Sequence, residues 1–352
     1  MLPRSGSNAH CTAPTAPHAT SSSAILRPFM IDENITSPVE LRPALVPWDT
    51  RAVNTFAHQP AHVRLGDLEV CRLGFGAMQL PGPMVWGPPR DPASARAVLR
   101  RVVELGINLI DTSWYYGPHV ANELIAEVLH PYPKDLVLVT KLGGRRTDDG
   151  GWSSALRPEE LRKGCETDLR LLRLDRIDVV HLRWIGHTDV PFREALDAMV
   201  GLQREGKIRH IALSNVTPAQ LRDAMTRATI VGVSNLYNVA RGERQLGKLP
   251  HASTEGQEEI VDLCREHGMA FLPFFLLAIP GPPGPKNEAL ATIAKARGAT
   301  EAQIAIAWLL ARSPTIAPIP GTSSPAHLDE NWHARTIELT KDELDAITAA
   351  RS

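Results

Sequence analysis

The sequence predicts a (β/α)8 barrel, an α/β fold, preceded by an irregular amino-terminal extension. Two observations support this prediction. Short apolar runs alternate with helix-like periodic segments from residue 61 onward, and ionisable residues stand at the ends of several of these runs. Eight strand–helix units joined by short turns favour a closed barrel over an open sheet. Because the carboxyl ends of all barrel strands face one opening, the ionisable residues are expected to share one site.

Composition and charge narrow the class of protein. The chain has 352 residues, of which 43% are hydrophobic and 22% charged, and its formal net charge is -1. This balance gives no overall attraction to nucleic acid or to anionic membranes. Apolar runs stay well short of the roughly 18 residues that span a bilayer. The four cysteines are widely spaced, which suits neither a zinc site nor a disulfide framework and favours a reducing, cytoplasmic location.

Residues 1–60 differ from the rest, and we place the barrel domain at residues 61–352. Residues 1–30 are rich in Ser, Ala, Thr and Pro, so they bury too little surface to offset their ordering entropy. Residues 31–60 show no periodicity and are expected to form an irregular arm. The alternatives for the first part are a disordered tail, a true translation start at Met30, and a weak organelle-targeting peptide.

The barrel is expected to begin with a hairpin and a strand. Residues 62–78 have the pattern of a short hairpin that leads into the first strand. A helical period of apolar residues follows at 93–106. Asp91 is suited to cap this helix, Pro92 to its first position and Gly106 to its end. These residues make the first strand–helix unit.

Seven further units repeat the alternation of a short apolar run and an amphipathic helix. The strands are expected at 107–111, 135–141, 176–182, 208–214, 230–236, 270–276 and 315–321. The helices that follow them are expected at 120–129, 157–172, 192–206, 218–228, 256–268, 289–298 with 302–312, and 326–334.

Four ionisable side chains stand at or just beyond the ends of these strands. Asp111 follows the run GINLI, and Tyr116 comes five positions later. Lys141 follows DLVLVT, and His181 follows RIDVV. A carboxylate, a phenol, an ammonium and an imidazole are the parts of a proton-transfer site. Each of them alone would more often be a cap or a solvated residue, so the prediction depends on the set.

Five motifs in order resemble the aldo-keto reductase family. They are DTSWYYG from Asp111, VTK at Lys141, DVVHL with His181, ALSN ending at Asn215, and IPGTSSPAHLDEN from Ile319. The match extends from about residue 61 to the end. LGFGAMQLPGP, WGPPRD, YGPHVANELI and FLPFF further resemble the bacterial pyridoxal reductases within the family. That subgroup has Asn where this chain has His181, so the chain carries the ordinary family residue there.

The resemblance implies roles for the four residues. A free tyrosine has a pKa of about 10, which is poorly matched to proton transfer at neutral pH. Lys141 would lower the pKa of Tyr116, and Asp111 would hold Lys141 by a charge-assisted hydrogen bond. Tyr116 would act as general acid in reduction, and His181 would orient the carbonyl oxygen. Tyr115 is expected to pack or to line the pocket.

The resemblance also implies a nicotinamide cofactor, NADPH by family habit, with NADH as the alternative. A Gly-rich dinucleotide fingerprint between a strand and a helix is lacking, so a Rossmann unit is not indicated. Ser214 and Asn215 would bind the carboxamide, and Phe274 would stack on the nicotinamide ring. The implied cofactor-binding residues are Gly76, Ala77, Met78, Ser214, Asn215, Ser234, Phe274, Leu277, Gly321, Thr322, His327, Glu330 and Asn331.

Several cofactor positions depart from the family pattern. Ser234 stands where Gln is usual, and serine is too short for the same carboxamide contact. Thr322 and the start of the helix after it would meet the 2′-phosphate of NADP. His327 stands where many relatives have Arg, and Gly321 where many have Lys. This chain therefore has less fixed positive charge for the 2′-phosphate than those relatives have. Glu330 and Asn331 match the pair that contacts adenine.

The substrate pocket is expected to use the aromatic and basic residues near the strand ends. Trp86, Trp114 and Trp184 would make walls that suit a planar ring, and Arg183 would meet a phenolate or acidic group. Each tryptophan is as readily a packing residue. We expect NADPH-dependent reduction of an aldehyde or ketone, with pyridoxal as one candidate substrate, in a monomer or small homo-oligomer.

Two other functions stay open at this point. A non-catalytic NADP(H)-binding regulatory or sensory subunit would share the fold, and the departures at Ser234, Leu276 and Ala278 fit it. A metal-dependent hydrolase would use Asp111, His181 and His187, but the chain has no HxH or paired-carboxylate pattern to support it.

Overall fold

The computed structural model describes residues 61–185, 188–239, 256–274 and 288–351. All of them belong to one structural unit, Val53–Ser352. The extension expected at residues 1–60, with Met30, lies outside the described residues, as do His187, Leu276, Leu277 and Ala278.

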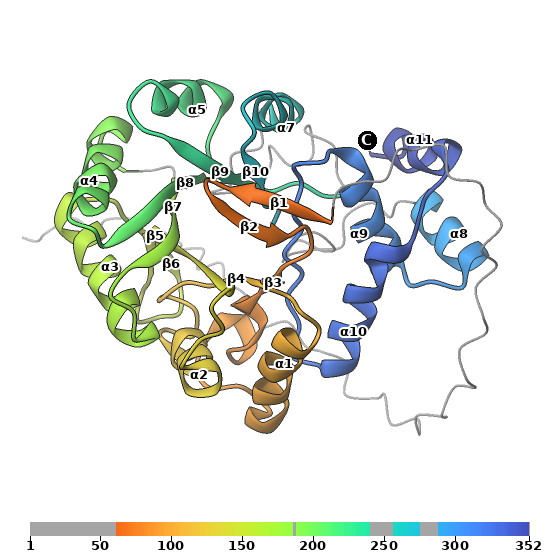
Figure 1. Ribbon diagram of the computed structural model, residues 1–352, viewed down its shortest axis with the longest axis horizontal. Helices are drawn as coiled ribbons and strands as arrows, with labels where there is room; N and C mark the ends of the chain where they lie inside the picture. Colours follow the sequence, from red (N-terminus) through yellow and green to blue (C-terminus); the bar gives the residue numbers. More distant parts are fainter. Residues whose placement is uncertain (1–60, 186–187, 240–255, 275–287, 352) are drawn as a thin grey trace, which may run out of the picture. The chain divides into compact units, whose positions relative to one another are not determined.

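A curled parallel sheet forms the centre of this unit, and helices surround it (Figure 1). Its strands pair in the order in which they follow along the chain, which confirms the predicted barrel. In sheet order they are β3 (Phe75–Gly76), β4 (Leu109–Asp111), β5 (Val137–Arg146), β7 (Ile177–Arg183), β8 (Ile208–Ser214), β9 (Ile230–Ser234) and β10 (Ala270–Phe271).

The eighth position of the barrel differs from the regular strand expected at 315–321. Ala317 N donates to Phe271 O at 2.8 Å, so the segment pairs with β10 on one side. On its other side the carbonyls of Pro318 and Pro320 accept from Gly74 N (2.9 Å) and Gly76 N (3.2 Å). The segment closes the ring, but its prolines have no N–H to complete a regular ladder.

A buried arginine supports this closure. Arg72 donates to the carbonyls of Leu310 (2.6 Å), Ser313 (2.7 Å) and Ile316 (3.2 Å). Burial lowers the pKa of its guanidinium to about 10. Leu310 lies in the last turn of the helix Glu301–Arg312 and Ser313 caps that helix, so these hydrogen bonds satisfy carbonyls at the helix end as well as the carbonyl of Ile316.

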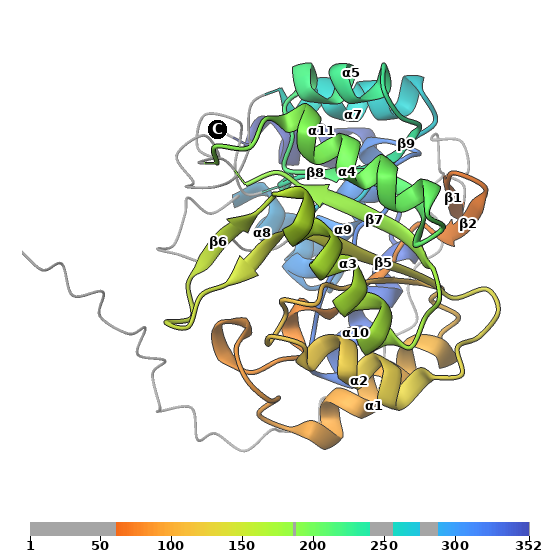
Figure 2. The same cartoon turned by 90° about the vertical axis from the view of Figure 1, so that its left-hand side faces the viewer.

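Two hairpins lie at opposite ends of the barrel (Figure 2). β1 (His62–Leu65) and β2 (Leu68–Cys71) pair antiparallel, as the sequence predicted, and their inward residues pack on the strands. At the other end β6 (Trp152–Ala155) pairs antiparallel with the extension of β5. This second hairpin was not predicted, because no strand was expected between Lys141 and the helix at 157–172.

The helices form the outer layer, and their apolar faces pack on the sheet in two large clusters. Asp91 caps α1, as expected, and accepts from Ala93 N and Ser94 N. The helices are α1 (Pro92–Glu104), α2 (Val120–Leu129), α3 (Pro158–Leu172), α4 (Phe192–Arg204), α5 (Pro218–Met225), α7 (Gln257–Glu266), α8 (Glu288–Arg297), α9 (Glu301–Arg312), α10 (Pro325–His333) and α11 (Lys341–Ala349). Short 3-10 turns are η1 (Ala77–Gln79), η2 (Pro83–Val85) and η3 (Ala334–Thr336).

Across the part of the chain that the structure describes, every helix is too short or too polar to cross a membrane.

Candidate active site

Neighbouring strands bring the predicted ionisable residues together at one end of the barrel. Lys141 on β5 pairs in register with His181 on β7, and Asp111 on β4 pairs with Val139 on β5. Residues that are an even number of positions apart on a strand share a face, so Lys141 projects on the same side as Val139. All three ionisable side chains are buried.

Lys141 and Asp111 form a buried ion pair. The Lys141 amine donates to Asp111 Oδ1 and, at 3.1 Å, to the carbonyl of Thr112. Burial raises the pKa of Asp111, while the Lys141 charge and hydrogen bond oppose that rise. Asp111 Oδ2 has no hydrogen-bond partner among the described residues. The carboxylate therefore fixes the position of the amine through one oxygen, and its other oxygen can still accept a hydrogen bond.

Tyr116 lies against this pair. The Lys141 amine is 5.2 Å from the centre of the Tyr116 ring, within the range of a cation–π contact. The expectation that Lys141 lowers the pKa of Tyr116 is not met here. Burial raises that pKa first, and the Asp111 charge raises it further. The Asp111 carboxylate compensates the amine, so the phenol lies in an apolar setting and stays protonated at neutral pH.

Arg183 is the cation that favours ionisation of Tyr116. It ends β7, and its charge lowers the pKa of the phenol against the effect of burial. Its Nη1 donates to Ser214 Oγ at 3.1 Å, and its guanidinium carbon is 4.9 Å from the centre of the Phe274 ring. Two of the predicted cofactor residues thus contact a residue that was predicted for the substrate pocket.

The side chain of His181 is buried beside Lys141. Neither imidazole nitrogen has a hydrogen-bond partner among the described residues. Burial and then the Lys141 charge lower the pKa of His181 to about 3. The ring is therefore neutral at physiological pH, and its single N–H can donate a hydrogen bond to a carbonyl oxygen.

The predicted nicotinamide-side residues come together at the ends of β8 and β9. Asn215 N donates to Asn235 Oδ1 at 2.7 Å, and Asn215 Nδ2 donates to Trp184 O at 2.6 Å. Its φ of 64° is left-handed, which asparagine tolerates better than most residues. The hydroxyl of Ser234 is buried, and no described residue hydrogen-bonds to it. A buried hydroxyl in this state has the capacity to bind a polar ligand group.

The end of β3 approaches the segment that precedes α10. A methyl group on Gly76 would come within 2.6 Å of Ile319 O, and one on Gly321 within 2.6 Å of Gly76 O. Only glycines fit this approach. The predicted residues Gly76, Ala77 and Met78 therefore lie beside the predicted carboxyl-terminal cofactor segment.

The helix α10 begins at Pro325, three residues after Thr322, close to the start at residue 326 that the sequence predicted. The Thr322 hydroxyl accepts from Ser324 N at 3.0 Å and forms a local turn. His327 and Glu330 are exposed, whereas Asn331 is buried. The side chain of Thr322 is thus committed to shaping the turn, and the backbone N–H groups of the first helical turn are the other groups suited to an anion.

The tryptophans expected in the pocket divide into two kinds. Trp114 packs beside Gly164 of α3, and Trp184 packs edge-to-face on Phe192 of α4, with ring centres 5.2 Å apart. Both therefore contact the helical layer. Trp86 pairs with Gly117 directly after Tyr116, and it is 39% exposed. Of the three, Trp86 is the one that lies exposed beside the Tyr116 segment.

Two features near the site were missed from the sequence. Asp168 on α3 is a buried carboxylate that accepts from Thr140 Oγ1, one residue before Lys141. Arg146 on the extension of β5 stacks between Trp86 and Trp152. The signal for the first was an acid on the apolar side of a helix. The signal for the second was the turn-forming run TDDGG after a strand.

Comparisons with known proteins agree with this geometry. The profile of the Aldo/keto reductase family matches residues 72–352. Pyridoxine 4-dehydrogenase from Escherichia coli is 43% identical over 288 residues, which are 80% of this chain and 96% of that protein.

Solved structures of the same family share the fold. A thermostable aldo-keto reductase in complex with the inhibitor epalrestat superposes with a TM-score of 0.66 at 26% identity, over 82% of this chain and 99% of that one. An aldo-keto reductase from Klebsiella pneumoniae in complex with NADP and acetate gives 0.61 at 24% identity, over 82% and 94%. With its barrel and its matched motifs, this chain belongs to the aldo-keto reductase family of NAD(P)H-dependent oxidoreductases, which act on carbonyl and CH–OH groups.

Proposed function

We propose that this protein reduces an aldehyde to a primary alcohol, with NADPH as the hydride donor and Tyr116 as the general acid. An aromatic aldehyde such as pyridoxal is the candidate substrate. The 43% identity to a pyridoxine 4-dehydrogenase supports this substrate class. The observation that carries the proposal is the buried Lys141–Asp111 pair against the ring of Tyr116, with His181 next to Lys141 in the sheet.

The protein's own groups divide the proton chemistry between them. Tyr116 is protonated at neutral pH because burial raises its pKa, so it can give its proton to the carbonyl oxygen. Neutral His181 donates a hydrogen bond to the same oxygen and orients it. The phenolate left behind is stabilised by the charge of Arg183.

The residues present fit a nicotinamide cofactor, which supplies the hydride when it is bound. The buried Ser234 hydroxyl and the side chain of Asn215 would hold the carboxamide. The close approach of Gly76 and Gly321 brings the end of β3 and the segment before α10 together, so both would contact the same cofactor. The backbone N–H groups at the start of α10 would hold a phosphate. They would do so without the lysine and arginine that many relatives have at the positions of Gly321 and His327.

Loss of NADPH absorbance with pyridoxal, measured for the wild type and for Tyr116→Phe, tests the proposal. We expect the variant to lose about 100-fold or more in kcat, as for removal of a general acid. Tyr115→Phe is the matched control, because its phenol is buried beside Tyr116, with ring centres 5.5 Å apart.

Equal rates in Tyr116→Phe and the wild type would reject the assigned acid. Binding of NADPH without turnover of any aldehyde would favour the regulatory-subunit alternative. The hydrolase alternative needs a metal site. Among the described residues no three His, Cys, Asp or Glu side chains are grouped to hold an ion, and His187 lies outside them.

A further inference from the structure

The exposed large apolar side chains gather at one place. Among the described residues, Met84, Trp86 and Trp152 are the large hydrophobic side chains with high exposure, at 79%, 39% and 45%. Met84 and Trp86 lie at η2, and Trp152 begins β6. Large apolar side chains that remain in water together mark a binding surface more often than a packing defect.

One arginine joins these side chains. The guanidinium carbon of Arg146 is 5.1 Å from the centre of the Trp86 ring and 4.2 Å from that of Trp152. Its Nη1 donates to Met84 O at 3.1 Å and to Val85 O at 2.9 Å. The planar guanidinium thus stacks on two indoles while its edges bind carbonyls, which a lysine cannot do.

The segment that Arg146 holds has a strained backbone. Met84 and Val85 have φ values of 58° and 59°, in the left-handed region. This region is costly for a β-branched residue such as Val85. Such conformations persist only where surrounding contacts enforce them, and they concentrate at functional sites. Here the contacts are the hydrogen bonds from Arg146 to both carbonyls.

The same surface continues into the candidate active site. Gly87 N donates to Gly117 O at 2.8 Å, next to Tyr116. The Trp152 ring meets Tyr115 edge-on, with centres 5.8 Å apart, and Tyr115 meets Tyr116 at 5.5 Å. The β5–β6 hairpin projects from the end of the barrel opposite the β1–β2 hairpin (Figure 2). The surface therefore borders the opening that contains the proton donor.

We propose that Met84, Trp86 and Trp152 form a substrate wall, and that Arg146 is the positioning residue that holds it. The wall accepts the flat ring of an aromatic aldehyde by stacking on an indole. Arg146 also donates to Gly151 O at 3.1 Å, so its donors are used to hold the wall and it does not serve as a ligand for substrate anions. This inference names the substrate class of the proposed reductase and rests on that function.

The test compares kcat/KM for an aromatic aldehyde, pyridoxal, with that for a short aliphatic aldehyde, propanal. Arg146→Lys and Trp152→Ala should lower the ratio of the two values by about threefold to tenfold, as expected for the loss of an aromatic contact. The change should appear chiefly as a higher KM for pyridoxal, and kcat/KM for propanal should fall less than that for pyridoxal.

Arg335→Lys is the matched control, because Arg335 stacks on Trp332 at 4.2 Å elsewhere on the surface. It should leave the ratio unchanged, and thermal melting should show that all three variants are folded. Equal losses for both aldehydes in Arg146→Lys would overturn the proposal.

A binding measurement separates this inference from the proposed function. Pyridoxal added to Tyr116→Phe should quench tryptophan fluorescence, and the additional change Trp152→Phe should weaken that quenching. Quenching by pyridoxal in a wild type that turns over no aldehyde would refute the proposed function and keep the wall. Quenching that is unchanged by Trp152→Phe would refute the wall even if the enzyme is active.

Discussion

Thr140 Oγ1 donates to Asp168 Oδ2 at 2.8 Å, directly behind the Lys141–Asp111 pair. The other carboxyl oxygen of Asp168 accepts from Asn122 Nδ2 at 2.6 Å, and Asn122 Oδ1 accepts from Thr112 Oγ1 at 2.7 Å. Thr140 precedes Lys141, and Thr112 follows Asp111. One buried carboxyl on α3 thereby ties together the two strands that carry the ion pair.

Asp168 should make stability depend on pH. Burial raises its pKa to about 7, although Thr140, Asn122 and the Lys141 charge oppose the rise. Between about pH 4 and 7 the native state then holds a proton that the unfolded state has lost, so stability falls as pH rises. Relative to Asp168→Asn, the free energy of unfolding of the wild type should fall by up to about 1.4 kcal/mol per pH unit in this window. Urea titrations across the window measure this difference, and a constant difference would contradict it.

His181 should act in the opposite direction. Its pKa is lowered to about 3 in the native state, so the unfolded state binds a proton as pH falls below about 6.5. Stability is therefore complete above that pH and is lost toward acid. His181→Asn, which removes the titrating ring, should flatten the acid side of the stability profile. An unchanged acid side would show that the pKa of His181 is the same in the folded and unfolded states.

Arg183 should control the ionisation of Tyr116. Its charge favours the phenolate, which is the form needed to oxidise an alcohol. Arg183→Gln should lower the alcohol oxidation rate at neutral pH by about tenfold and move its basic limb to higher pH, since a charge contact shifts a pKa by about one unit or more. Arg183→Lys keeps the charge and should keep the limb. A profile that is the same in both variants would assign Arg183 to binding alone.

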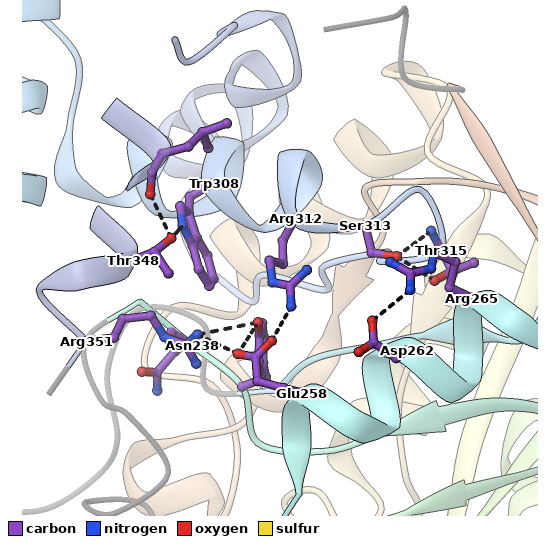
Figure 3. A network of polar contacts seen from close by, with 12 residues as sticks. Asn238, Glu258, Asp262, Arg265, Trp308, Arg312, Ser313, Thr315, Thr348 and Arg351 are labelled. Carbon is purple, nitrogen blue, oxygen red and sulfur yellow. Dashed lines mark hydrogen bonds and ion pairs between the residues drawn. The ribbon is translucent and has the colours of Figure 1, made fainter. Parts of the chain in front are cut away.

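The penultimate residue should stabilise the carboxyl-terminal half of the barrel. Arg351 Nη1 contacts Glu258 Oε1 at 2.8 Å, and Arg351 Nε donates to Asn238 O at 3.0 Å (Figure 3). Its guanidinium also stacks on Tyr237 and Trp308, at 4.6 and 4.9 Å.

Only 7% of the Arg351 side chain is exposed, so Arg351→Ala should cost about 1–3 kcal/mol of unfolding free energy. Arg265→Ala is the control in the same view. Arg265 pairs with Asp262 at 3.0 Å, and both side chains are largely exposed, so its loss should cost at most about 0.5 kcal/mol. Equal effects of the two variants in chemical denaturation would show that burial does not set the strength of the Arg351 contacts.

The sequence predicted what depends on local patterns. Short continuous apolar runs located the strands and segments of period 3.6 located the helices, because each pattern fits one kind of buried surface. Asp111, Lys141 and His181 were placed at one opening because parallel strands in a barrel all end there. The carboxyl-terminal helix α11 was also readable, since Thr340 and Glu343 form a capping box, although it was not predicted.

Only the tertiary structure decided the pKa of Tyr116 and the contact between Arg146 and Trp86 near the site. The sign of the Tyr116 pKa shift depends on burial and on the balance of the Asp111 and Arg183 charges, none of which sequence spacing encodes. The clamp of Arg146 on Trp86 joins residues sixty positions apart. Local sequence fixes periodicity and turns, whereas charge balance and stacking depend on distances between segments that meet only when the barrel closes.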